Sequence, residues 1–438
     1  MWGGKLSTTV ECGRAGDSPR AAGILSLSSQ MESALSRNRR SSLSAFAVLV
    51  GTPALALVLA GCGLSLTIPT ATPFVIPTTP TPRATPTPTL RPSPTMPTGT
   101  FTRIATLPSR GSGYSATLLK DGRVLIAGGT GDGYKALDTA EIYDPAKNSF
   151  TPTGSMTIGR TDHSATLLVD GRVLIAGGAT SENSGFLASA ELYDPKTGKF
   201  TPTAPMAAAR ESQNAPAIGD GLVLVIGGDT GCTLGICKIV PTAEIYDPEV
   251  GAFRAAGKFW QARSGNTATL LIDGRVLLVG GEGADGRSLA TLELYDPATG
   301  VSTPTGPLNK YRYGSTATRL LNGRVLIAGG FTEDTVEVFD PLTGRSIPGG
   351  PMTVPRGLHT ASLLTDGRVL ITGGVLTSGD KASCELYDPI TGKFTPTGSM
   401  TSARSGHLAI TLNDGRVFIL GRDYASGGTS DSAEFYQP

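Results

Sequence analysis

The sequence predicts an all-β protein in which seven copies of one four-stranded unit close into a seven-bladed propeller. Gly and Pro supply 58 and 31 of the 438 residues while charged residues make up only 17%, which favours a turn-dense β protein over a helical one. Beyond residue 100 one pattern recurs with a period of about 50 residues, as in propellers and other repeat arrays. The last copy also lacks one strand, and a segment just before the first copy matches that strand.

Two short motifs mark the repeats. A turn of sequence Asp-Gly-Arg-Val, or a variant of it, begins at Asp121, Asp170, Asp220, Asp273, Asn322, Asp366 and Asp414. A second motif, Glu-x-Tyr-Asp-Pro with Phe once in place of Tyr, begins at Glu141, Glu191, Glu244, Glu293, Glu337 and Glu385, and survives as Glu434-Phe435-Tyr436. Seven units follow from this count.

The second unit illustrates the four strands. Residues 164–168 and 172–176 read as a hairpin closed by Asp170-Gly171, a pair expected to take the positive φ values of a tight turn. Residues 190–193 form the third strand, and the turn that begins at Asp194 leads into a fourth strand over 199–203. Pro202 cannot donate a hydrogen bond to a neighbouring strand, so the fourth strand is expected at the outer edge.

The fourth strand indicates how the ring closes. It is expected after units one to six, around Phe150, Phe200, Phe253, Val301, Ser346 and Phe394. The chain ends at Pro438 before a seventh copy, whereas residues 100–105 match its pattern. We therefore expect this early segment to complete the last sheet and to remove the open edges of a linear stack.

The chain before residue 100 has the layout of an exported and anchored protein. Residues 1–30 lack a pattern, so Met31 is the expected start, and residues 31–62 read as an export signal with a basic cluster followed by an apolar stretch. The stretch ends in Leu59-Ala60-Gly61-Cys62, which resembles the lipobox of bacterial lipoproteins and assigns the lipid anchor to Cys62. The alternative is a signal anchor that spans the bilayer as a helix.

A tether is expected between this signal and the repeats. Residues 63–99 are rich in Pro and Thr, which favours an extended, disordered linker over packed structure, and the Thr content makes O-glycosylation an open alternative. Together these segments predict an exported protein held on the outer side of the bacterial cytoplasmic membrane or on the cell surface. The net charge of +1 excludes strong binding to nucleic acid, and we expect a monomer.

The repeats resemble the kelch motif over residues 100–438. The resemblance rests on the double glycine after the second strand, the aromatic residue on the third strand and the recurring Arg-x-x-His, which begins at Arg160, Arg356 and Arg404. It implies a propeller whose first strands line a central channel. Kelch propellers serve as enzymes and as binding platforms, so the resemblance predicts fold and not function.

One repeated position is the main candidate for ligand binding. It lies at the start of each first strand and holds Tyr114, His163, Gln213, Asn266, Ser315, His359 and His407. In a kelch propeller this ring of side chains is expected to face the channel near one mouth, where imidazoles can hold a metal. The competing interpretation is a turn-bonding role, which is favoured because other hydrogen-bonding residues replace His there. Trp260 and Tyr313 lie on the variable loops of the same rim and are added as binding candidates.

Other repeated or paired residues favour structural roles. Each unit has a Glu on its third strand, and six units have an Arg after the fourth strand. A structural role for these residues, as partly buried ion pairs that hold the ring, is therefore favoured over a catalytic role. Cys232 and Cys237 share one long loop, which in an exported protein predicts a disulfide, with a two-thiol metal site as the weaker alternative. Cys384 occupies a third-strand position that holds Ala in other units and reads as packing.

The sequence thus predicts a surface-tethered protein that binds a carbohydrate or protein ligand, without catalysis, cofactor or metal. The alternative is a secreted enzyme at the channel mouth, similar to galactose oxidase, whose copper site resembles a pair of His with tyrosines, one of them cross-linked to a cysteine. The repeats contain no adjacent Tyr-His pair, so the sequence departs from that pattern. Copper is expected only under this alternative.

Overall fold

The computed structural model describes residues 99–104, 111–131, 135–181, 184–233, 236–331, 333–376, 379–422 and 431–438. All of these lie in the compact unit over Leu90–Pro438. The expected export signal, Cys62 and the Pro/Thr linker lie outside the described residues. Within the described residues no helix has the length and apolar character needed to cross a membrane.

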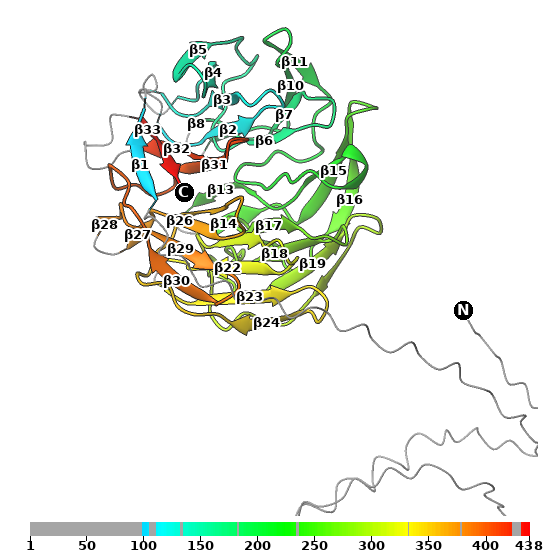
Figure 1. The fold of residues 1–438 in the computed structure, drawn as a ribbon. Helices are drawn as coiled ribbons and strands as arrows, with labels where there is room; N and C mark the ends of the chain where they lie inside the picture. The colour runs from blue at the N-terminus through cyan, green and yellow to red at the C-terminus, as the bar shows by residue number, and fades with distance from the viewer. Residues whose placement is uncertain are drawn as a thin grey trace, which may run out of the picture. The chain divides into compact units, whose positions relative to one another are not determined.

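The described chain is built from antiparallel β-sheets arranged as the repeats predict (Figure 1). The one described helix is a single 3₁₀ turn over Gly219–Gly221. In the first two repeats the sheets are β2 (Tyr114–Leu118), β3 (Val124–Gly128), β4 (Ala140–Asp144) and β5 (Ser149–Pro152), then β6 (Ser164–Leu167), β7 (Val173–Ala176), β10 (Ala190–Asp194) and β11 (Lys199–Thr203). The expected all-β propeller with the fourth strand at the outer edge is therefore observed.

The middle repeats keep this order with two irregularities, of which the first is a parallel bridge between Lys258 and Val301 that joins the outer strands of the third and fourth repeats. The middle repeats comprise β12 (Val223–Val225), β15 (Thr242–Asp247) and β16 (Ala252–Lys258); β17 (Thr267–Leu270), β18 (Val276–Val279), β19 (Leu292–Asp296) and β20 (Val301–Pro304); and β21 (Thr316–Arg319), β22 (Val325–Ala328), β23 (Val336–Asp340) and β24 (Arg345–Pro348). The third repeat lacks a continuous inner strand and keeps only two isolated bridges, at Asn214 and Ala217. Pro216 lies between them and has no N–H to donate, which explains the difference from the expected four strands.

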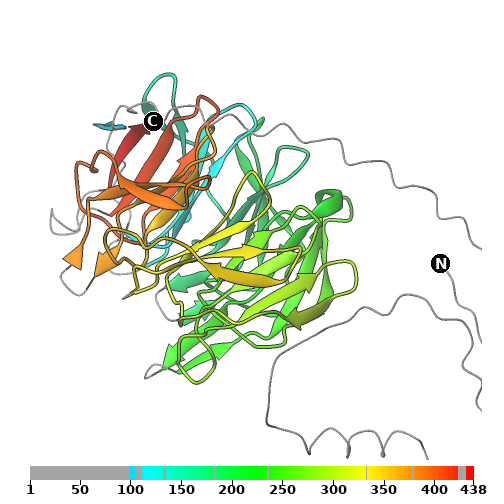
Figure 2. The ribbon, with the colours of Figure 1, turned by 60° about the horizontal axis from the view of Figure 1, so that its bottom comes forward.

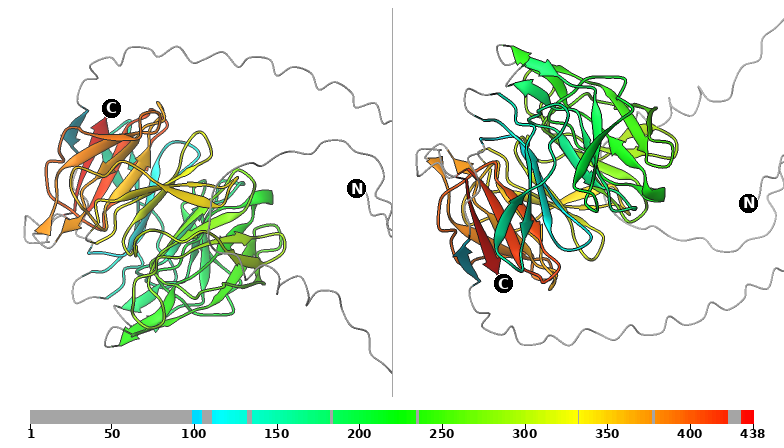
Figure 3. Two further views of the ribbon diagram at one scale, coloured as in Figure 1. Left: turned by 90° about the horizontal axis from the view of Figure 1, so that it is seen from below. Right: turned by 90° about the horizontal axis from the view of Figure 1, so that it is seen from above.

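The last two repeats contain β25 (Thr360–Leu363), β26 (Val369–Thr372), β29 (Cys384–Asp388) and β30 (Lys393–Pro396), then β31 (Leu408–Thr411), β32 (Val417–Arg422) and β33 (Asp431–Gln437). Strand β1 (Thr100–Arg103) pairs antiparallel with β33, so the order of the last sheet is β1-β33-β32-β31. Phe101 lies opposite Tyr436, with 5.0 Å between their ring centroids. Other views also place β1 beside the C-terminal strand (Figures 2 and 3).

The hydrophobic core lies between neighbouring sheets. The second strands supply its most buried residues, such as Val173 and Ile175, which are fully shielded from solvent. Seven clusters of buried side chains are present in the described residues, and each combines two neighbouring repeats. One of them packs Val124 and Tyr143 of the first repeat against Phe418 of the last. A single sheet of this size is therefore stabilised by the two sheets beside it.

The repeated Asp-Gly turns differ from the expected geometry. Gly171 has a φ of +94°, but Asp170 does not take a positive φ. The N–H of Gly171 donates to the carbonyl of Leu168, and Asp170 instead accepts the N–H of Arg172 on its carboxylate at 2.9 Å. This is a three-residue loop with the glycine in the left-handed position. Asp220 is the exception among these turns, with a φ of +61°.

Candidate functional site

The loops that vary between repeats gather on one rim of the propeller. They run from second to third strands and from fourth strands to the next first strand, whereas the Asp-Gly and Pro-containing turns lie on the opposite rim. Three of the loops contain hairpins, which are β8 (Ala179–Ser181) with β9 (Ser184–Phe186), β13 (Asp229–Thr233) with β14 (Ile236–Ile239), and β27 (Val375–Leu376) with β28 (Gly379–Asp380). These loops have no alternating pattern of polar and apolar residues from which such short hairpins could be predicted.

The residue just before each first strand has an unusual backbone conformation. The residue there has a positive φ in all seven repeats, and it is a glycine in four of them. The other three are Asp162, Ser212 and Leu358, with φ values of +52°, +54° and +52°. The N–H of Asp162 donates to the carbonyl of Gly113, and the N–H of Ser212 donates to the carbonyl of Asp162. Backbone hydrogen bonds thus link neighbouring repeats around the channel and hold these residues in a strained conformation.

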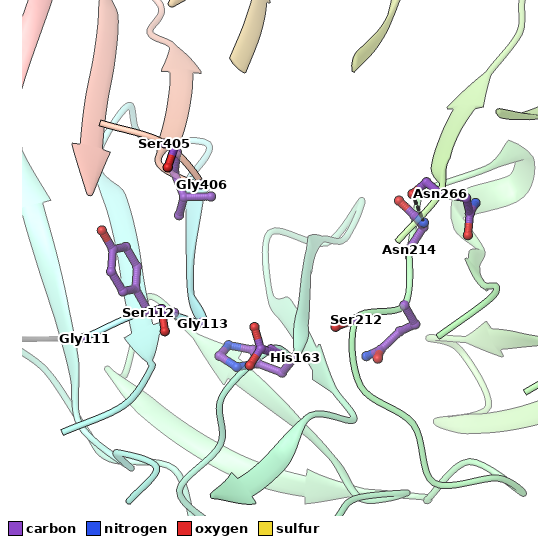
Figure 4. Close-up of a pocket in the computed structure, with 13 residues that line it drawn as sticks. Gly111, Ser112, Gly113, His163, Ser212, Asn214, Asn266, Ser405 and Gly406 are labelled. Atoms are coloured by element: carbon purple, nitrogen blue, oxygen red, sulfur yellow. Dashed lines mark hydrogen bonds between the residues drawn. The ribbon is translucent and has the colours of Figure 1, made fainter. Parts of the chain in front are cut away.

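A cavity of about 350 Å³, which we call the mouth cavity, opens at this level of the channel (Figure 4). Its wall comes from the seventh, first, second, third and fourth repeats. The lining residues are Gly111, Ser112, Gly113, Tyr114, Asp162, His163, Ser212, Gln213, Asn214, Asn266, Ser405, Gly406 and Leu408. Hydroxyls and amides dominate this wall, and Asp162 is its one carboxylate. The amide of Asn214 donates to the carbonyl of Asn266 at 2.9 Å, which joins two parts of the wall.

The mouth cavity contains part of the predicted ring of ligand-binding side chains. Tyr114, His163, Gln213 and Asn266 line it, but Ser315, His359 and His407 do not. The Nε2 atom of His163 lies 2.8 Å from the hydroxyl of Ser115, one repeat away. His359 and His407 make the same contact with Thr316 and Thr360, at 3.0 Å each. The side chains at the ring position therefore bond neighbouring repeats to each other. In most repeats a residue with a hydroxyl group directly follows the ring position, and this pattern is the sequence signal for such bonds.

The three histidines remain neutral in this environment. Their side chains are buried, with exposed fractions of 9%, 5% and 4% for His163, His359 and His407. Burial, helped by a neighbouring arginine, lowers the pKa of each to about 3. Each Nε2 already has a hydroxyl partner, so these imidazoles are arranged as structural groups.

The described residues do not assemble the donors that copper needs. The described part of the chain brings no three His, Cys, Asp or Glu side chains together in a way that holds a metal ion. The histidines sit on three different repeats and bond to hydroxyls instead of to one another. The residues present therefore do not fit a copper site like that of the oxidase alternative.

Three carboxylates lie on the rim of the second and third repeats. Glu211 and Asp229 face each other across a backbone bridge in which each N–H donates to the other's carbonyl, at 3.0 and 3.1 Å. Burial, together with the nearby carboxylates of Asp162 and Asp229, raises the pKa of Glu211 to about 7. Burial also raises the pKa of Asp162. Like charges held together in this way make the edge of the mouth cavity negative.

The Arg and Glu of the repeats form fully buried ion pairs. The pairs are Arg160–Glu191, Arg210–Glu244, Arg263–Glu293, Arg312–Glu337, Arg356–Glu385 and Arg404–Glu434. All six arginine side chains are inaccessible to solvent. Arg160 lies in the loop between the first and second repeats: its backbone bonds Leu137 and Gly129 of the first repeat, and its side chain bonds Glu191 of the second. The pair therefore fastens this loop to the third strand of the second repeat and joins the two repeats. This structural role agrees with the preference drawn from the sequence.

An aromatic patch lies on the same rim at the fifth repeat. Tyr313 stacks on Phe331, with 5.4 Å between ring centroids and 11° between ring planes. The two rings and Tyr311 line a second cavity of about 370 Å³. Trp260 is 58% exposed and does not line either cavity. Of the two predicted rim aromatics, Tyr313 thus lines one of these two cavities and Trp260 lines neither.

Three cysteines lie in the described residues, two of them paired across a hairpin and one buried alone. The backbones of Cys232 and Cys237 lie directly opposite each other in the β13–β14 hairpin. Cys384 is buried in the core between the sixth and seventh repeats, and burial raises the pKa of its thiol to about 12. Cys384 is therefore a packing residue, as its repeat position predicts.

Comparisons with known proteins agree with this architecture. The model of the Kelch motif family matches residues 113–157 and 160–207. A fungal alcohol oxidase of the AA5 family, solved in complex with copper, has a similar structure, with a TM-score of 0.64 and 18% identity over 78% of this chain and 76% of that one. The structure of YjhT is also similar, with a TM-score of 0.52 and 16% identity over 67% of this chain and 99% of that one. No curated protein sequence matches the chain at a significant level.

These likenesses concern the fold alone, because both identities are low. The seven marks in the sequence, the two matches to the Kelch motif and the antiparallel sheets all describe one architecture. The prediction of a kelch-repeat propeller is confirmed.

Proposed function

We propose that this kelch-repeat propeller is an exported binding protein that holds a carbohydrate in the mouth cavity and performs no catalysis. The observation that carries the proposal is the lining of that cavity. Its hydroxyl and amide side chains, one carboxylate and one tyrosine are the groups that bond sugar hydroxyls and stack on sugar rings. A kelch fold supports a binding role in general, and the cavity adds the kind of ligand.

The size of the cavity limits the ligand. Its volume of about 350 Å³ is near the lower end of the range of roughly 300–1,000 Å³ found for small-molecule sites. We therefore expect it to hold one or two sugar units at the end of a longer chain. A lipid at Cys62 and the linker over 63–99 would hold the propeller away from the membrane, where glycans are accessible.

The test compares binding by the exported chain and two variants of the cavity. The ligand is selected on a glycan array and its affinity is measured by titration calorimetry. Asp162→Asn removes the charge, and Asn tolerates the left-handed backbone at this position. Ser405→Phe places a ring inside the cavity. Both changes are expected to weaken binding at least tenfold, which corresponds to about 1.4 kcal/mol.

Lys196→Ala is the matched control, since Lys196 is exposed on the opposite rim. It should bind as the unchanged protein does. Equal affinities for all four proteins would show that the ligand binds elsewhere and would refute the assignment of the mouth cavity.

A protein ligand is the second candidate, and the aromatic patch at the fifth repeat favours it. Tyr311 is 70% exposed and Phe331 41% exposed, so the patch offers large apolar side chains to a partner. A pull-down in which binding is lost in Tyr311→Ala but kept in Ser405→Phe would favour this candidate over the carbohydrate.

A further inference from the structure

The hairpin of the third repeat places two cysteines in register. Strands β13 and β14 run antiparallel, and Cys232 lies opposite Cys237. Opposed residues of an antiparallel pair have their Cα atoms about 4.5 or 5.5 Å apart, depending on the hydrogen bonding of the pair. A disulfide needs a Cα separation of roughly 4.4–6.8 Å. The backbone of the hairpin therefore meets the requirement of a disulfide with either kind of pairing.

We propose that Cys232 and Cys237 form a disulfide that clamps this hairpin at the edge of the mouth cavity. The bond forms by thiol–disulfide exchange with the disulfide of an oxidoreductase in the export compartment. The Sγ atoms of the two cysteines become joined and lose two electrons and two protons. The disulfide of the oxidoreductase breaks and takes them up as two thiols.

The disulfide is linked to the mouth cavity through the first residue of the hairpin. Strand β13 begins at Asp229, whose backbone is bridged to Glu211 by two hydrogen bonds. The carboxylate of Asp229 accepts the N–H of Gly231 at 2.8 Å and the hydroxyl of Ser264 from the next repeat. The clamp therefore acts on the strand that holds one of the rim carboxylates.

Strand β13 also packs on the neighbouring repeat. A Cβ atom added to Gly231 would lie 2.5 Å from Cζ of Phe186, so the strand passes close over that ring. Phe186 ends β9 in the hairpin of the second repeat. A hairpin fixed by a disulfide keeps this contact between the hairpins of the second and third repeats. This inference does not depend on the nature of the ligand.

The first test is a peptide map of the full exported chain. Both cysteines fall in the tryptic peptide 211–238, because cleavage follows Arg210 and Lys238. Without reduction this peptide is expected to be lighter by two hydrogen atoms and to resist alkylation. Cys384 should be alkylated once the chain is denatured, which shows that the reagent reaches free thiols. Alkylation of both cysteines without a reductant, or linkage of either to another chain, would overturn the proposal.

The second test asks whether the bond clamps the hairpin. Amide hydrogen exchange is compared for the oxidised chain, the reduced chain and a Cys232→Ser, Cys237→Ser double variant. Closing so short a loop is expected to slow exchange of residues 229–239 by about tenfold or more, whereas the amides of β18, which lie in another repeat, should be unaffected. Equal exchange of the hairpin in all three samples would refute the clamp even if the disulfide forms.

Discussion

Replacement of Arg160 by methionine tests the structural role of the buried ion pairs. In the second repeat Arg160 donates to Glu191 at 2.8 Å and to the carbonyls of Gly177 and Ser189 at 2.8 and 3.1 Å. Glu191 also accepts the N–H of Thr157 at 2.8 Å. Both charged side chains are buried, with exposed fractions of 0% and 1%. Methionine keeps much of the length of the side chain but removes its charge and its hydrogen bonds.

The expected loss of stability is large because the buried carboxylate of Glu191 is left without an opposite charge beside it. Breaking a buried ion pair by removal of one member costs about 3–5 kcal/mol. Two backbone carbonyls also lose a donor, which places the expected value for Arg160→Met near the upper end of that range. Replacing both members, as Arg160→Met with Glu191→Leu, removes the stranded charge and should restore most of the loss.

The assay is urea unfolding followed by circular dichroism, with Arg172→Met as the matched control. Arg172 belongs to the same repeat and pairs with Asp170 at 2.6 Å, but the two side chains are 34% and 43% exposed. Exposed pairs contribute about 0–1 kcal/mol, so this variant should unfold close to the unchanged protein. Equal losses for Arg160→Met and Arg172→Met would refute the reasoning, as would a double variant less stable than the single one.

Three further predictions concern the mouth and the rim. Glu211→Gln should raise the melting temperature at pH 8. The pKa of Glu211 is about 7 in the folded state and 4.5 ordinarily, so the unchanged protein loses stability as the pH rises from 4.5 to 7. The gain in the free energy of unfolding is at most about 3 kcal/mol, and melting curves should show that it vanishes near pH 4.5. A gain that persists at that pH would contradict this prediction. His407→Gln should reduce acid destabilisation between pH 6.5 and 3, because the neutral imidazole with a pKa of about 3 gains no proton in the fold whereas the unfolded chain does. Gln213 already serves at the equivalent position, so an unfolded variant would contradict this prediction. Trp260→Ala with Tyr313→Ala should abolish ligand retention without a lower melting temperature if the aromatic rim binds; retained binding would discard those two residues.

The repeats could be predicted from the sequence because each strand position recurs. The buried second strands, the outer position of Pro202 and the match of residues 100–105 to a fourth strand all followed from patterns that several copies share. Pairing of β1 with β33 and Cys384 in the core are in line with these patterns. Features specific to one repeat were harder to predict, as Pro216 and the hairpins of the variable loops show.

The candidate site was less predictable, because it depends on contacts between repeats. The sequence placed His163, His359 and His407 at one ring position, but it did not show that each imidazole bonds a hydroxyl of the neighbouring repeat. Asp162 and Glu211 lie just before the ring position, but the sequence does not single them out, since one acidic residue beside a strand forms no pattern. Their importance becomes visible only once the backbone bridges bring them to one rim.

The mouth cavity exists only if the first and last repeats meet, because Tyr114 and Ser405 line it from those two repeats. A cysteine pair introduced as Thr100→Cys and Gln437→Cys tests this most directly, since these exposed residues are opposed in the β1–β33 register. The account predicts that a peptide map shows the two joined and that the melting temperature rises on oxidation, whereas Thr100→Cys with Thr201→Cys stays unlinked. Failure of residues 100 and 437 to cross-link would contradict a ring closed by β1 and, with it, the mouth cavity.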